Sequence, residues 1–248
     1  MRYILGIPTF NRDDMLLKTL EAIRASTFPP ELILVVNNND RPLSFRHDLF
    51  PDVWICRNAF KTPGPEQGHQ TVLTWASAFN YDVAVRWDDD LVPEPDCLGR
   101  LTARVDQGYC SACGGMYPRP GDDKYSSVNG AGDGFNGHLQ FFTWKGEHRF
   151  ILRRHLYSSF AYDVKIALRA GGFCPMYSRY GFRGETDFTM RLSRRGGHLG
   201  VDTAAIAHHH WAAGGTRAYT QAEADGLSKL DHELFIKRMT EYGIRVTE

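Results

Sequence analysis

The sequence has no long run of apolar residues and no excess of charge of either sign. Its 29 basic and 29 acidic residues, in a chain of 248, give a formal net charge of zero. No bulk attraction to nucleic acid or to an anionic membrane is therefore expected. No apolar segment is long enough to cross a bilayer, so we expect no transmembrane segment. What remains is an ordinary globular composition, with room for one large domain or two small ones.

Cysteine is also scarce. The chain has five cysteines, an odd number, and its first residues lead into a strand pattern rather than a signal peptide. We therefore expect reduced thiols and a cytoplasmic location. Cys110 and Cys113 form a C-x-x-C motif, but a strand-like segment follows them, whereas redox motifs of this kind stand at a helix N-terminus. No second pair of zinc ligands is obvious, so buried structural thiols are favoured.

Two apolar segments near the start are separated by a helical pattern. Residues 3–7 and 32–36 are predicted to be buried strands, and Leu16, Leu20 and Ile23 recur at the spacing of one helix face. A strand–helix–strand unit predicts parallel strands joined by a right-handed crossover. Both strands end in polar residues at the same edge of the sheet, which is where ligands bind in open α/β sheets.

The rest of the chain continues this alternation. We predict one α/β domain with a mostly parallel central sheet flanked by helices. Proline and glycine predict a loop over 61–68. The segment 221–242 predicts a helix with Leu227, Leu230 and Leu234 on one stripe, packed on the outside of the domain. Further strands are predicted over 53–56 and 111–116, and further helices over 72–79, after Pro93 and Pro95, over 164–170, and around Phe188 and Leu192.

Three adjacent carboxylates, Asp88, Asp89 and Asp90, end the apolar segment that begins at Val83. Adjacent carboxylates repel one another, and burying them is costly unless a cation compensates their charge. At the carboxyl end of a strand they lie where a divalent ion would bind together with substrate phosphates. The acids therefore predict a site for Mn²⁺ or Mg²⁺. The alternative is a solvated acidic turn that caps the next helix.

Two further polar clusters allow both a functional and a structural interpretation. His208 and His210 share a face of an extended segment and suit Mn²⁺ or Zn²⁺, although three zinc ligands from adjacent residues would be strained. The alternative is a histidine cluster at the surface or the edge of the core. Glu185 and Asp187 stand before a short helix, whose dipole alone favours acids there. The functional interpretation is a general base beside a ligand.

Turn-forming residues are concentrated between 117 and 146. Loops of this length in compact domains are usually functional or disordered. The run from Gly130 to Gly134 does not follow a strand and open a helix, so it is not a dinucleotide fingerprint. A lid or an acceptor-side loop is the better interpretation, with Gly132 within it and the aromatic rings of Phe142 and Trp144 able to close over donor and acceptor.

The order of these motifs resembles that of the family 2 glycosyltransferases of GT-A fold, which use nucleotide-diphosphate sugars. The chain has, in succession, strand-Pro-Thr-Phe-Asn-Arg, strand-Asn-Asn-Asn-Asp, strand-Asp-Asp-Asp, Gly-Gly-Phe, Glu-Thr-Asp-Phe-Thr-Met-Arg-Leu and Ala-His-His-His. The resemblance covers about residues 1–211. It implies a single GT-A-type domain over 1–215, with a nucleotide-binding half over about 1–116 and an acceptor and catalytic half over about 117–215. Residues 216–248 then form a helical extension packed on the domain.

The resemblance also implies roles for individual residues. Glu185 takes the place of the catalytic base if the following Thr-Asp-Phe and Arg191 stay in register, and Asp187 is the competing acid. Asp90 is implied as a ligand of the metal ion. Asp88 is implied near the ribose and is also a candidate metal ligand. His208 and His210 are further candidate metal ligands. The residues implied on the nucleotide side are Pro8, Thr9, Asn11, Arg12, Asn37, Asn39, Asp88 and Asp89.

The implied activity is transfer of a sugar from a nucleotide-diphosphate donor to a hydroxyl-bearing acceptor such as a sugar, glycan, lipid or protein. An inverting single displacement needs one metal ion and one base. Asn37 stands where the family usually has an Asp that reads the nucleobase. An amide can still accept from a uracil N–H and donate to a carbonyl, so a UDP-sugar stays the first choice. Two alternatives from other classes stay open: a hydrolase with two metal ions, and a nucleotide-sugar binding module without turnover.

Overall fold

A nine-stranded sheet forms the centre of the protein, seen in a computed structural model that describes residues 1–44, 50–61, 63–118, 120, 125–127, 140–142 and 149–246. The strand order is β3-β2-β1-β4-β10-β6-β11-β5, and β9 joins by pairing with β11. Strands β1 to β4, β6 and β11 run in one direction, whereas β5, β9 and β10 run in the other. The sheet is therefore mainly parallel, as predicted. Its strands are β1 (Tyr3–Thr9), β2 (Leu32–Asn37), β3 (Val53–Arg57), β4 (Val83–Arg86), β5 (Leu91–Pro93), β6 (Ala112–Met116), β9 (Phe150–Arg153), β10 (Phe160–Asp163) and β11 (Leu199–His209).

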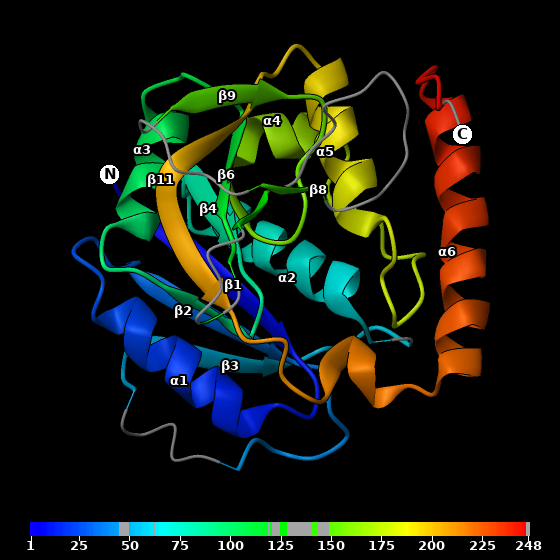
Figure 1. Cartoon of the computed structure of the whole chain (residues 1–248), viewed down its shortest axis with the longest axis horizontal. Helices are drawn as coiled ribbons and strands as arrows, with labels where there is room; N and C mark the ends of the chain where they lie inside the picture. Colours follow the sequence, from blue (N-terminus) through cyan, green and yellow to red (C-terminus); the bar gives the residue numbers. More distant parts are fainter. Residues whose placement is uncertain are drawn as a thin grey trace.

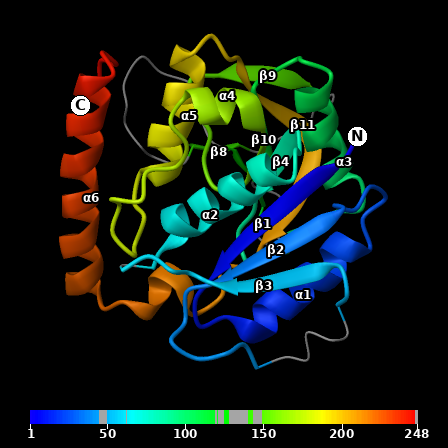
Figure 2. The same cartoon turned by 180° about the vertical axis from the view of Figure 1, so that it is seen from behind.

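Helices cover both faces of this sheet (Figure 1). Alternate residues of β1 face opposite layers: Leu5 packs in the cluster that contains Leu20 and Leu98, whereas Ile4 packs in the cluster that contains Val72. Figure 2, the view from behind, shows α2 running beside β1. A small separate sheet pairs β7 (Tyr125–Ser127) with β8 (Gln140–Phe142). The helices are α1 (Asp13–Arg24), α2 (Pro65–Ala78), α3 (Cys97–Asp106), α4 (Val164–Arg169), α5 (Gly184–Arg194) and α6 (Gln221–Glu241), with a 3-10 turn η2 (Gly215–Ala218).

Most predicted elements are present, and the first strand–helix–strand unit is parallel as expected. Two helix starts were misplaced. α2 begins at Pro65, inside the predicted loop 61–68, because a proline in the first helical turn needs no hydrogen-bond donor. α5 begins at Gly184, so Glu185 and Asp187 lie in its first turn rather than before it. The residues between the acids and α3 form the short strand β5.

Helix α6 runs along the side of the molecule, next to α5 (Figure 1). A capping box between Thr220 and Glu223 begins it. The predicted leucine stripe is only partly correct: Leu230 is 61% exposed, whereas Leu234 packs against the cluster that contains Phe235. The buried residues of α6 are Asp231, Phe235 and Met239. No helix in the described part of the chain is long and apolar enough to cross a membrane.

Candidate active site

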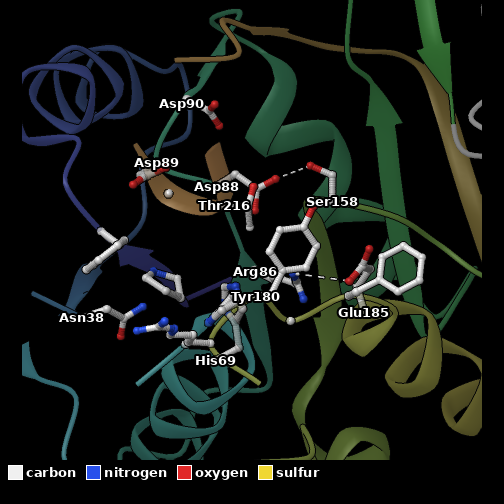
Figure 3. A pocket seen from close by; sticks show the side chains of 18 of the residues that line it. Asn38, His69, Arg86, Asp88, Asp89, Asp90, Ser158, Tyr180, Glu185 and Thr216 are labelled. Carbon is white, nitrogen blue, oxygen red and sulfur yellow. Dashed lines mark hydrogen bonds and ion pairs between the residues drawn. The ribbon is translucent and has the colours of Figure 1, made fainter. Parts of the chain in front are cut away.

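A cavity of about 700 Å³ lies at the carboxyl ends of β1, β2 and β4. Each of these strands ends in a buried polar residue, Thr9, Asn37 or Arg86, so the predicted sheet edge is the edge that holds the pocket. Figure 3 shows Asp88, Asp89 and Asp90 on one side of the pocket and Glu185 on another. Sequence-predicted residues that line it are Pro8, Arg12, Asp88, Asp89, Asp90 and Glu185.

Arg12 compensates two of the three carboxylates. Its Nη1 atom donates to Oδ1 of Asp89 at 2.6 Å and lies 3.1 Å from Oδ2 of Asp90. Thr9 donates to the other oxygen of Asp89 at 2.7 Å. Burial raises the pKa of Asp89 to about 6, against the opposing charge of Arg12. The side chains of Thr9 and Arg12 are thus both bound to Asp89, and Arg12 and Asp89 line this end of the pocket.

Asp88 and Asp90 are held from other elements. Ser158 donates to Oδ2 of Asp88, and the backbone amide of Asp88 donates to the hydroxyl of Ser159 at 2.9 Å. The amide of Ala212 donates to Oδ2 of Asp90 at 3.2 Å. The chain after β11 therefore closes over the acids and fixes Asp90.

The histidine that faces the acids is His209, and not the predicted pair. Its Nε2 atom lies 3.2 Å from Oδ1 of Asp90, and it lines the pocket. His208 points to the other side of β11, where its Nε2 lies 3.2 Å from Oε1 of Glu94. His210 contacts Asp90 through its backbone amide, at 2.9 Å from the carbonyl oxygen. Because side chains alternate along a strand, the predicted face was the wrong one.

Glu185 and Asp187 have different surroundings, although both are buried. Glu185 lines the pocket, and burial raises its pKa. Asp187 accepts from Arg191 at 2.6 Å and from Arg238 of α6 at 2.7 Å, and it does not line the pocket. Asp187 therefore links α5 to α6, and this position does not support the predicted role as a competing base.

The asparagines at the end of β2 are mostly occupied within their own turn. Asn37 accepts from the backbone and side-chain nitrogens of Asn39 and donates to the carbonyl of Arg41. Asn39 also accepts from the backbone amide of Asn11 at 2.8 Å. Asn37, Asn39 and Asn11 were predicted on the nucleotide, but Asn38 is the residue of this turn that lines the pocket.

Comparison with known proteins now adds to this geometry. The family model described as Glycosyl transferase family 2 matches residues 5–166, which is more than half of the chain. The chain belongs to this family. It is therefore a glycosyltransferase, as the order of its motifs implied. A search of curated proteins found no match to this glycosyltransferase.

Solved structures of other glycosyltransferases share its fold. It is similar to S. aureus TarS residues 1–349 (TM-score 0.61, 13% identity, 97% of this chain and 72% of that one). It is similar to GalNAc-T7 solved with UDP, GalNAc and Mn²⁺ (TM-score 0.66, 12% identity, 99% and 55%). A third is the mannosyltransferase PcManGT from Pyrobaculum calidifontis with GDP-Man and Mn²⁺ (TM-score 0.57, 15% identity, 84% and 56%). At these identities the likeness concerns the fold, and the glycosyltransferase spans little more than half of the last two proteins.

A metal site in this glycosyltransferase can be tested against its side chains. The described residues contain no group of three or more His, Cys, Asp or Glu side chains that could hold a metal ion. Asp90 and His209 are nevertheless adjacent, and Asp88 lines the same pocket. An ion such as Mg²⁺ is often held by one or two carboxylates plus substrate phosphates. The donor set therefore fits an ion that arrives with a diphosphate.

Several pocket residues of the glycosyltransferase were missed from the sequence. Arg86 could have been found, because it is the lone charged residue in the otherwise apolar strand β4. Nothing in the sequence marked His69 as a pocket residue. Both ring nitrogens of His69 are buried without a hydrogen-bond partner among the described residues, and burial, with the charge of Arg86 next, lowers its pKa. Other missed lining residues are Asn38, Ser158, Arg179, Tyr180, Trp211, Thr216 and Tyr219.

Two other predictions can be placed. Cys110 and Cys113 are buried free thiols that do not line the pocket. Of the predicted lid, Gly132 and Trp144 lie outside the described residues, and of Phe142 only the backbone, in β8, is described.

Proposed function

We propose that this glycosyltransferase uses a divalent metal ion to transfer a sugar from a nucleotide-diphosphate donor, with UDP-sugar as first choice, to a hydroxyl acceptor with inversion. One observation carries the proposal: Glu185 and the Asp88–Asp90 cluster line a single pocket from different elements. A pocket of this kind brings a candidate base and a diphosphate-binding end to one substrate.

The base is proposed to be Glu185. The carboxylate takes the proton of the acceptor hydroxyl while that oxygen attacks the anomeric carbon of the donor sugar. The bond between this carbon and the diphosphate oxygen breaks, and the nucleoside diphosphate leaves with the electron pair. Because attack and departure occur on opposite faces of one carbon, a single step inverts the configuration. Glu185 then holds the proton released by the acceptor.

The metal is proposed to bind between the protein and the diphosphate. Asp90 and His209 would hold it, with Asp88 nearby on the ribose side. When bound, the ion supplies positive charge that stabilises the departing diphosphate. Arg12 shares Asp90 and brings a second cation to the same end of the pocket. GalNAc-T7 and PcManGT were both solved with Mn²⁺, which supports this choice of ion.

The nucleobase is proposed to lie near Pro8 and Asn38. The side-chain oxygen of Asn38 accepts from Asn58 at 2.8 Å, and an amide oxygen has a second lone pair for a uracil N–H. TarS was also solved with UDP-GlcNAc, and GalNAc-T7 with UDP, which supports uracil over guanine as the first choice. The sugar and the acceptor are not specified by these residues.

A test begins with a panel of UDP- and GDP-sugars, screened by thermal shift with Mn²⁺, because a bound donor raises stability. With the donor that binds, Glu185→Gln should keep binding and lose about 10²–10⁴-fold in transfer. Asp187→Asn is the matched control from the same helix turn and should keep transfer once folded. Full transfer by Glu185→Gln would refute the proposed base. Donor cleavage that is independent of any acceptor would indicate a hydrolase instead.

A further inference from the structure

Arg86 contacts two buried carboxylates, those of Glu66 and Glu185, and Figure 3 shows it beside Glu185 in the pocket. Its Nη1 atom donates to Oε1 of Glu66 at 2.9 Å, and its Nη2 atom lies 3.9 Å from Oε2 of Glu185. The side chains of Arg86, Glu66 and Glu185 are only 5%, 0% and 11% exposed. One guanidinium therefore serves two carboxylates, one from α2 and one from α5, with little screening by water.

Glu66 is fixed in its place by close packing. A Cβ atom added to Gly184 would lie 2.3 Å from Cδ of Glu66, so this acid packs directly on the first turn of α5. The residue after Gly184 is Glu185 itself. The other oxygen of Glu66, Oε2, is buried without a hydrogen-bond partner among the described residues. The hydrogen bond described for the Glu66 side chain is thus the one from Arg86.

We infer that Arg86 is a positioning residue that keeps Glu185 ionised and directed into the pocket, and that Glu66 holds Arg86 there. The inference rests on the proposed role of Glu185 as base. A base must be unprotonated before the acceptor arrives, and a buried carboxylate without a cation takes up a proton instead. Arg86 supplies the cation that this carboxylate needs.

The charges around the pair support this division of roles. Burial raises the pKa of Glu66 to about 8 and raises that of Glu185 as well, while Arg86 opposes the shift in both. Glu66 is the more deeply buried of the two, at 0% against 11% exposed, so its carboxyl group has less help from solvent when it ionises. The other charged and titratable groups that face the pair are Asp88, Arg183, Asp187, Arg191, His69, Tyr162 and Tyr177.

The test measures the pH midpoint at which the Glu185 carboxyl group titrates. Carbon NMR of the full chain, labelled at glutamate carboxyl groups, gives it directly, without donor or acceptor. Glu185→Gln identifies the signal by removing it. Arg86→Gln alone could disturb folding by leaving Glu66 unpaired, so it is made in a Glu66→Gln background. Relative to Glu66→Gln, the double variant should titrate Glu185 about one to three pH units higher. Restoring a cation with Arg86→Lys should bring the midpoint back down.

The control removes a different arginine–carboxylate pair. Arg104 lies 2.9 Å from Asp202 in the contact between α3 and β11, so Arg104→Gln loses a similar pair that does not touch Glu185. This variant should leave the pH midpoint of Glu185 unchanged. Loss of Arg86 should also leave it unchanged if Arg86 has only a structural role. An unchanged midpoint in the double variant would overturn the inference. Full transfer by Glu185→Gln would instead refute the proposed base, whatever the midpoints show, so the two failures are distinguishable. In active variants, the acidic limb of kcat/KM against pH should move with the midpoint.

Discussion

The Nε2 atom of His209 lies 3.2 Å from Oδ1 of Asp90, which brings the end of β11 onto the turn that follows β4. An imidazole nitrogen and a carboxylate oxygen at this separation can both turn to the same ion, since both are ligands of Mn²⁺. The pair gives the metal proposal a specific test.

Asp90→Ala and His209→Ala should each weaken UDP binding in Mn²⁺ far more than in EDTA, because each removes a proposed ligand. His208→Ala is the control, since its side chain lies on the opposite side of the strand with Glu94. Titration calorimetry with UDP measures both conditions. Equal affinities of His209→Ala and wild type in Mn²⁺ would remove His209 from the metal site.

Asp187→Asn should lower the free energy of unfolding by about 3–5 kcal/mol, because it leaves the guanidinium groups of Arg191 and Arg238 without their buried carboxylate. Urea unfolding measures this loss. Glu185→Gln makes the same chemical change two residues away, at a side chain 3.9 Å from its nearest cation. It should lose much less stability, and a similar loss in both variants would contradict the structural role assigned to Asp187.

Gly184→Ala should be destabilising by about 1–3 kcal/mol, since its methyl group would overlap the carboxyl group of Glu66. Gly226→Ala in the interior of α6 is the matched change, because nothing lies within 4 Å of the added atom. That variant should gain about 0.5–1 kcal/mol through helix propensity. Thermal unfolding of both variants compares them, and a neutral Gly184→Ala would show that Glu66 is not packed as described.

The contribution of Glu66 to the stability of the protein should fall as pH rises from about 4.5 toward 8. Its pKa is about 8 in the folded chain and 4.5 when exposed, so the folded state binds more protons in this window. The stabilisation is complete below the lower value and is lost as pH passes the upper one. Glu66→Gln removes this contribution, so its free energy of unfolding should depend less on pH. Asp89, whose pKa is also raised, should keep part of the slope in both proteins.

The sequence predicted the sheet and the position of the acids well, because buried strands and a break into three carboxylates are local patterns. It failed by one residue at two places. Among the asparagines at the end of β2, Asn38 lines the pocket while Asn37 closes the turn, and identical neighbours give no sign of which does which. At the end of β11, His209 faces the acids because that register is set by pairing with β5.

Other features depend on contacts between distant parts of the chain. Arg12 was predicted on the nucleotide, yet it pairs with Asp89, which is distant in sequence. In α6 the leucines suggested an apolar stripe, but the helix packs through Asp231, Phe235 and Met239. A buried carboxylate on a packing face is visible only once its partners are known.

The hydrogen-bond partners of Asp231 belong to a segment that lines the pocket. Its carboxylate accepts from the backbone amides of Ser178 and Phe182, at 2.6 and 2.9 Å, and the segment between them lines the cavity. A stop codon before Asp231 would therefore leave every strand of the sheet encoded and still release this wall. Such an allele would remove the support of one pocket wall, although the family match ends at residue 166, far upstream of the lesion.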